Sequence, residues 1–164
     1  MDYNHFAYSE MLARKLKPIA HTDDDCHFFR ASAQTKMQEL LENISSAKGG
    51  VLIAVDGKII DFSWNNSDSL MIKPIYGIVI LFPAKSTDAN TIFAVQAQAT
   101  EVALQIIAKM MQDANRYISD CDKIDPESFQ IDGFGPMADL FYGVELSFNL
   151  DDGLNYELNP DMWL

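Results

Sequence analysis

The sequence predicts an α+β fold: a mainly antiparallel sheet of about four to five strands, a long helix packed on one face, and two shorter N-terminal helices. Three observations support this prediction. A helical apolar stripe runs through residues 88–118, short apolar runs rich in β-branched residues lie before it, and alternation at residues 140–150 follows it. A chain of 164 residues is of the size of one domain, residues 1–164.

The long helix is predicted from apolar residues that recur every three or four positions. Asp88 and Asn90 are candidate N-caps, and Pro126 prevents the helix from continuing far beyond residue 125. A helix of this length needs a broad apolar surface beneath it, which a sheet provides. The stripe consists of Ile92, Val95, Ala99, Val102, Ile106, Met110 and Tyr117.

Two shorter helices are expected in the N-terminal part. Residues 6–16 have helical apolar spacing and are followed by Pro18, whereas residues 32–46 form a second helix ended by Gly49 and Gly50. Residues 26–30 fit either a short strand or the lead into the second helix.

Three strands are expected before the long helix. Residues 51–55 and 58–64 flank Asp56-Gly57, a residue pair typical of tight hairpins, and so predict two antiparallel strands. Residues 72–82 predict a third strand. Its Pro74 lacks an amide donor, which places the start of that strand at an edge or a bulge.

The C-terminal part predicts two further strands. Residues 129–132 alternate, residues 133–139 interrupt the regularity, and residues 140–150 give the clearest strand of the chain. In that last strand one set of residues is expected to face the core: Tyr142, Val144, Leu146, Phe148 and Leu150.

Composition limits the classes of partner. The formal net charge of −12 argues against direct binding to nucleic acid or to an anionic membrane surface, although Arg14, Lys15 and Lys17 form a small basic patch. The N-terminus lacks the apolar core of a signal peptide and no run approaches a membrane span, so a cytoplasmic location is expected. Cys26 and Cys121 are expected to be reduced.

The polar segment of residues 21–27 is the one candidate metal site. If it were extended, His21, Asp23, Asp25 and His27 would share one face and could act as ligands of a divalent metal. Consecutive aspartates are, however, also typical of a solvated turn. Both interpretations stay open at this point.

Motifs of enzymatic chemistry are absent from the sequence. There is no GxGxxG or Walker-type glycine loop for a nucleotide and no GxSxG elbow for a nucleophile. We therefore expect no cofactor and no catalytic residue.

The last 14 residues, 151–164, form a candidate interaction tail. This tail mixes four acidic residues with large apolar ones, and such side chains dock either on their own subunit or on a neighbour. The apolar residues are Leu154, Tyr156, Leu158, Met162 and Trp163.

The predicted order of elements, and the segment ADLFYGVELSFNL at residues 138–150 followed by an aromatic tail, resemble small phage and prophage virion proteins of the tail-terminator and head–tail joining (neck) type. The resemblance implies a late strand that closes the sheet, a homo-oligomeric ring, commonly sixfold, at the end of a tail tube, contacts with other phage structural proteins, and no chemistry. Because aromatics and methionine are enriched in interface cores, the candidate contact residues are Trp64, Tyr156, Met162 and Trp163.

Two other functions remain open from the residues alone. The first is a monomeric acidic binding module or small metal-dependent protein centred on residues 21–27. The second is an acidic inhibitor of a basic partner, which the net charge would suit.

Overall fold

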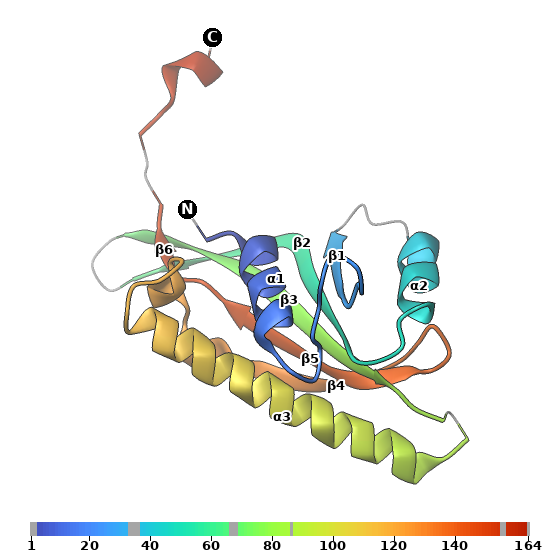
Figure 1. The fold of residues 1–164 in the computed structure, drawn as a ribbon. Coiled ribbons are helices and arrows are strands. Elements are labelled where there is room, and N and C mark those ends of the chain that lie inside the picture. Colours follow the sequence, from blue (N-terminus) through green and yellow to red (C-terminus); the bar gives the residue numbers. More distant parts are fainter. Residues whose placement is uncertain (1–2, 33–36, 66–68, 86, 155–156, 164) are drawn as a thin grey trace.

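The computed structural model describes residues 3–32, 37–65, 69–85, 87–154 and 157–163 and confirms an α+β fold (Figure 1). The sheet has six strands in the order β1-β2-β3-β5-β4, with β6 paired to β3. All pairings are antiparallel except the parallel β1–β2 pair, so the sheet is mixed. The strands are β1 (Phe28–Ser32), β2 (Val51–Trp64), β3 (Leu70–Pro83), β4 (Gln130–Met137), β5 (Phe141–Asn149) and β6 (Asp152–Gly153).

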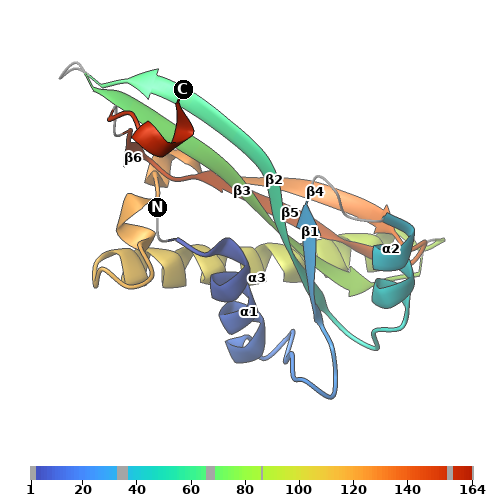
Figure 2. The ribbon, with the colours of Figure 1, turned by 90° about the horizontal axis from the view of Figure 1, so that it is seen from above.

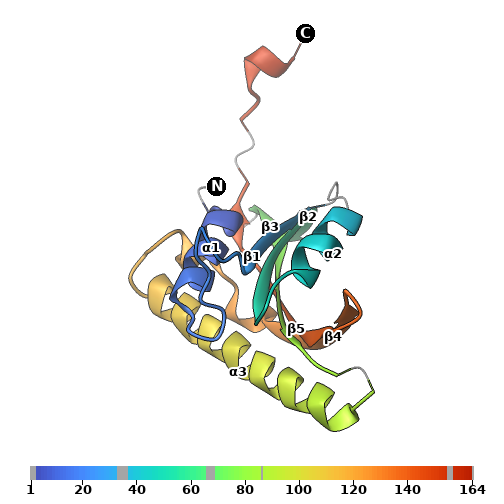
Figure 3. The same cartoon turned by 45° about the vertical axis from the view of Figure 1, so that its right-hand side comes forward.

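Helices cover both faces of the sheet (Figure 3). The first, α1 (His5–Lys15), and the long α3 (Ala89–Ala114) pack on one face, where the larger part of the core lies. The short α2 (Met37–Ser45) covers the opposite face at one end, where Leu40 and Ile44 contact a second cluster. The strands contribute Val51, Ile53, Val79, Leu81 and Phe141 to that cluster.

The long helix confirms the apolar stripe but ends earlier than predicted. Asp88 caps it by accepting hydrogen bonds from the amides of Asn90 and Thr91. The helix ends at Ala114, and Tyr117 lies beyond it, exposed and with a positive φ of 54°. The residues that face the sheet are Ala99, Val102, Ala103, Ile106 and Met110.

By length and mean hydropathy, α3 is the one helix of the described residues that could cross a membrane. Here its apolar stripe packs against β3 and β5 instead, which is the arrangement of a water-soluble domain.

The predicted hairpin at Asp56-Gly57 is wrong, because β2 runs through this pair as one strand with a bulge. The Asp56 carboxylate accepts hydrogen bonds from the Lys58 amide at 3.0 Å and the Lys58 ammonium at 2.6 Å. Lys58 takes a left-handed φ of 55°, which absorbs the extra residues without reversing the chain. The turn that reverses the chain is at Asn65 and Ser69, whose backbone N and O lie 3.0 Å apart.

The prediction for Pro74 is confirmed in a specific form. Its carbonyl accepts a hydrogen bond from the Leu150 amide, so its nitrogen faces the same side of β3. On that side β5 has ended at Asn149, and β6 begins only at Asp152. The residue without a donor therefore lies where its neighbouring strand is interrupted.

The other strand predictions are confirmed in part. Residues 28–32 form a strand, so the strand interpretation of residues 26–30 is the correct one, and Ser32, predicted to open the second helix, belongs to this strand. The second helix is described over Met37–Ser45. Residues 133–137, predicted to be irregular, belong to β4. In β5, Tyr142 is only half-buried and Phe141 is buried on the opposite face under α2, whereas the predicted inward residues Val144, Leu146, Phe148 and Leu150 are buried.

A buried histidine anchors α1 to the sheet. The ring of His5 stacks on Tyr76 with centroids 4.6 Å apart, and its Nε2 lies 2.9 Å from the carbonyl oxygen of Gly77. Its Nδ1 lies 3.3 Å from the Tyr3 hydroxyl. Burial disfavours the charged ring and lowers the pKa of His5 from its ordinary value of 6.5 to about 4.

Acidification is expected to destabilise the protein through His5. Between pH 6.5 and pH 4 the unfolded chain binds a proton at His5 that the folded chain does not, so stability falls as the pH falls through this window. Going from pH 7 to pH 5 should cost about 2 kcal/mol from this group. Urea unfolding at both pH values checks this, and His5→Gln, whose amide can still donate to Gly77, should reduce the difference. Equal pH dependence in both proteins would contradict it.

The close pairing of β3 and β5 depends on Gly143, because a Cβ at this position would collide with the carbonyl oxygen of Ile80. Gly143→Ala should therefore destabilise the fold by about 3 kcal/mol or more, measured by urea unfolding. Gly153→Ala is the matched control in β6, since no atom lies within 4 Å of its added Cβ. Similar losses for the two variants would count against this explanation.

Candidate functional site

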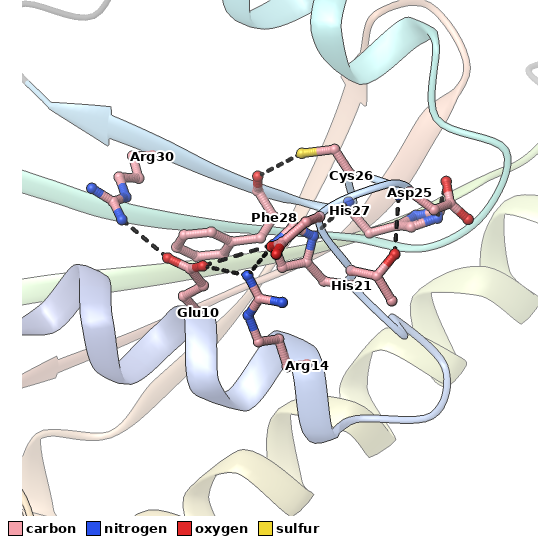
Figure 4. Close-up of polar contacts among 10 residues, drawn as sticks. Glu10, Arg14, His21, Asp25, Cys26, His27, Phe28 and Arg30 are labelled. Atoms are coloured by element: carbon pink, nitrogen blue, oxygen red, sulfur yellow. Dashed lines mark hydrogen bonds and ion pairs between the residues drawn. The ribbon is translucent and has the colours of Figure 1, made fainter.

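The polar segment of residues 21–27 does not gather its side chains around one point (Figure 4). The two histidine rings are buried and hold the segment to the domain. His21 Nδ1 accepts a hydrogen bond from the His27 amide at 3.2 Å. His27 Nδ1 donates to the carbonyl oxygen of Gly50 at 2.8 Å, and its Nε2 lies 3.1 Å from an Asp25 carboxylate oxygen.

Arginines occupy the other carboxylates of this region. Arg14 binds Asp23 at 2.5 Å and Glu10 at 2.9 Å, while Arg30, from β1, binds the second oxygen of Glu10 at 3.0 Å. These hydrogen bonds from Arg14 and Arg30 lower the pKa of Glu10. Burial, followed by the charge of Arg14, lowers the pKa of His21. Glu10 and Asp23 are therefore neutralised by the two arginines.

This arrangement gives the metal hypothesis no support. His21, Asp23, Asp25 and His27 have separate partners, and the described part of the chain contains no group of three His, Cys, Asp or Glu side chains placed to hold a metal ion. Sequence reasoning missed Glu10 and the two arginines, since their proximity to the segment depends on how α1 packs beside β1.

An open cleft of about 420 Å³ lies between α1, β1 and α2. Glu10, His21 and Arg30 contribute its polar wall, and Phe28 and Leu40 its apolar wall. The exposed Cys26 is at its rim, where the thiol donates to the carbonyl oxygen of Phe28.

A second feature is the outer half of the β2–β3 hairpin within residues 58–75, which the structure describes at 58–65 and 69–75. We call it the projecting hairpin (Figure 2). In the described residues, β1 covers β2 only as far as Asp56, so the outer edge of β2 beyond Lys58 has no neighbouring strand. Four large apolar side chains of this segment are exposed: Ile59, Ile60, Phe62 and Trp64. Trp64, a predicted contact residue, is 69% exposed at the end of β2.

One face of the projecting hairpin carries a continuous apolar surface. The register pairs Ile60 with Pro74, Phe62 with Ile72, and Trp64 with Leu70, so these side chains share the face on which α1 and α3 pack. At the base of this face lies a hollow of about 220 Å³. Its lining includes Lys58, Ile59, Ile60, Ile72, Pro74 and Tyr76, and we call it the hairpin hollow.

The tail leaves the domain at β6, beside the projecting hairpin, and extends away from the body (Figures 1 and 3). Residues 157–163 are exposed, including Leu158 at 70%, Met162 at 78% and Trp163 at 67%. A short turn, Pro160–Met162, is capped by Asn159, which accepts from the Asp161 amide. Tyr156, the remaining predicted contact residue, lies outside the described residues.

The three described contact candidates therefore lie on two uncovered apolar elements: Trp64 on the projecting hairpin, and Met162 and Trp163 on the tail. The sequence analysis did not name Ile59, Ile60 and Phe62 as contact residues. They are exposed in the part of β2 that extends beyond its described pairing with β1, and the sequence pattern does not reveal where that pairing ends.

Comparison with known proteins adds no relative: no protein-family model matches the chain, and a search of curated proteins finds no match.

The histidine segment is predicted to act in folding rather than in metal binding. Titration with zinc or manganese, followed by calorimetry, should show no tight stoichiometric site. His27→Ala should instead destabilise the domain by about 1–3 kcal/mol, because it leaves the carbonyl oxygen of Gly50 without its buried donor. Tight one-to-one binding that disappears in the double variant His21→Ala/His27→Ala would refute this.

Proposed function

We propose that this protein is a structural virion protein of a phage or prophage tail or neck, which associates with copies of itself into a ring and contacts neighbouring virion proteins. The observation that carries this proposal is the pair of uncovered apolar elements, the projecting hairpin and the tail. Both stand outside a domain whose own core is complete. The resemblance of residues 138–150 and the aromatic tail to tail-terminator and neck proteins supports the same function.

Exposed strand edges favour association physically. In the described residues no strand pairs with the outer edge of β2 beyond Lys58, so its backbone groups can pair with another strand. Burial of the apolar face beside them would further stabilise such a contact. When such a contact joins two different surfaces, repetition closes a ring or continues as a filament. Closed rings are the form that the end of a tube requires.

The charged groups of the cleft also favour a structural role. Glu10 and Asp23 are each bound by an arginine, and the rings of His21 and His27 hold the chain in place, so in the described residues these groups neutralise one another. We propose no catalytic residue and no cofactor. The protein would be made in the cytoplasm and incorporated into the virion without direct contact with nucleic acid or membrane, which suits its net charge of −12.

A second candidate function is a monomeric acidic binding module. It is favoured by one observation, the open cleft of about 420 Å³ with both polar and apolar walls. A strictly monomeric protein would point to this function.

Self-association should be visible in solution. Light scattering on a sizing column, across protein concentrations and ionic strengths, should show a discrete closed oligomer, a hexamer for sixfold symmetry. Added salt should strengthen it, because salt screens the repulsion between copies that each carry −12. Trp64→Ser should weaken the oligomer, whereas Phe93→Ser, at an equally exposed position on α3, should not. A monomer under every condition would overturn the proposal.

A further inference from the structure

We infer that the tail of one copy docks in the hairpin hollow of a second copy, so that Met162 and Trp163 enter the space lined by Ile60, Ile72 and Tyr76. This inference rests on the proposed self-association and names the two surfaces that make the contact.

The first argument is that the tail does not use its apolar side chains within its own subunit. The side chains of Leu158, Met162 and Trp163 are 67–78% exposed. The described end of the tail lies away from the body in two views (Figures 1 and 3). The hydrogen bonds of Met162 and Trp163 are local, to the carbonyl oxygens of Asn159 and Pro160. These three side chains are therefore free to bury apolar surface against another molecule.

The second argument is the shape and chemistry of the hairpin hollow. It is lined by aliphatic, proline and tyrosine side chains together with the ion pair of Asp56 and Lys58. At about 220 Å³ it has room for one aromatic side chain together with part of a neighbour. Aromatic and methionine side chains seated in such pockets commonly dominate the binding free energy of an interface.

The third argument is the charge of the two surfaces. Residues 151–164 carry four acidic groups and no basic one, in a chain with a net charge of −12. The projecting hairpin, residues 58–75, contains two lysines and two aspartates and is formally neutral. Lys58 and Asp56 both line the hollow and form an ion pair at 2.6 Å, so they neutralise each other. An acidic tail therefore meets little repulsion there, whereas it would be repelled by the acidic surface elsewhere.

A second copy is the occupant that satisfies all three observations, because every copy carries one tail and one hollow. Each subunit of a ring would then donate its own tail and accept that of its neighbour, which is a head-to-tail contact. Three apolar side chains alone bury less surface than a stable pair of proteins needs. Two contacts per subunit and ring closure supply the additional stability.

The head-to-tail geometry allows a mixing experiment. Ile60→Asp places a charge in the hollow and spares the tail, whereas the double variant Met162→Asp/Trp163→Asp spoils the tail and spares the hollow. All three residues are exposed, so both variants should fold, which circular dichroism and thermal unfolding check. Phe93→Asp, at an exposed position on α3, is the control for an added charge.

Each defective variant alone should lose the oligomer, with its association weakened by about tenfold or more. An equal mixture of the two at high protein concentration should rise toward twice the monomer mass, because one intact tail and one intact hollow remain for a single contact, which is weaker than the closed ring. Phe93→Asp should assemble like the unaltered protein. A peptide of residues 151–164 should bind the tail-defective variant saturably, and adding Ile60→Asp to that variant should abolish the binding.

Three results would overturn the inference. If the unaltered protein is oligomeric and both variants remain so, the subunits meet through another surface, and the proposed function stands without this contact. If both variants are monomeric and the mixture stays monomeric, with no peptide binding, the tail does not dock in the hollow of a second copy. If the unaltered protein is itself monomeric at all concentrations, the proposed self-association fails, and this inference fails with it.

Discussion

The length of β3 relative to its neighbours is the constraint on which the rest of this structure depends. Its residues Ile78 and Ile80 face α1 and α3, while Val79 and Leu81 face α2, so its inner half forms the centre of both core clusters. Its outer half continues beside β2 past the ends of β1 and β5. One strand thus organises the core and carries the surface that the core leaves uncovered. Proline at position 74, at the interruption between β5 and β6, marks the boundary between the two halves.

Residues whose burial follows a local hydrophobic periodicity were predictable from the sequence. The stripe on α3 and the inward set of β5 from Val144 to Phe148 are local periodicities, and a half-buried helix or strand imposes them directly. Asp56-Gly57 was not predictable in the same way. The pair is common in turns, but here the Asp56 carboxylate binds Lys58 instead, and β3 continues to pair with the strand on both sides of the bulge. Tertiary pairing decided between two conformations that the local sequence allows.

The candidate sites also differ in whether local sequence or tertiary pairing determines them. The candidate contact residues Trp64, Met162 and Trp163 could be named from the sequence, because aromatic residues and methionine are enriched in interface cores. The hairpin hollow could not, since it is formed by residues of β2 and β3 that only the bulged register brings together. For the histidine segment the structure gives the metal hypothesis no support among the described residues. Its spacing allowed a shared face, but Arg14 bound Asp23, and the carbonyl oxygen of Gly50 accepted from His27.

The acidic composition affects which surfaces of two copies can meet. A net charge of −12 on each copy opposes association through most of the surface, and the opposition is felt within about 10 Å at moderate salt. Residues 58–75 are formally neutral and include the exposed apolar side chains of Ile59, Ile60, Phe62 and Trp64. A contact through the acidic surface would bring like charges together, whereas a contact at the hairpin would bring together mainly apolar groups. In the proposed assembly, this repulsion would disfavour contacts through the acidic surface and so favour contacts at the hairpin, which is the selectivity that a closed ring requires.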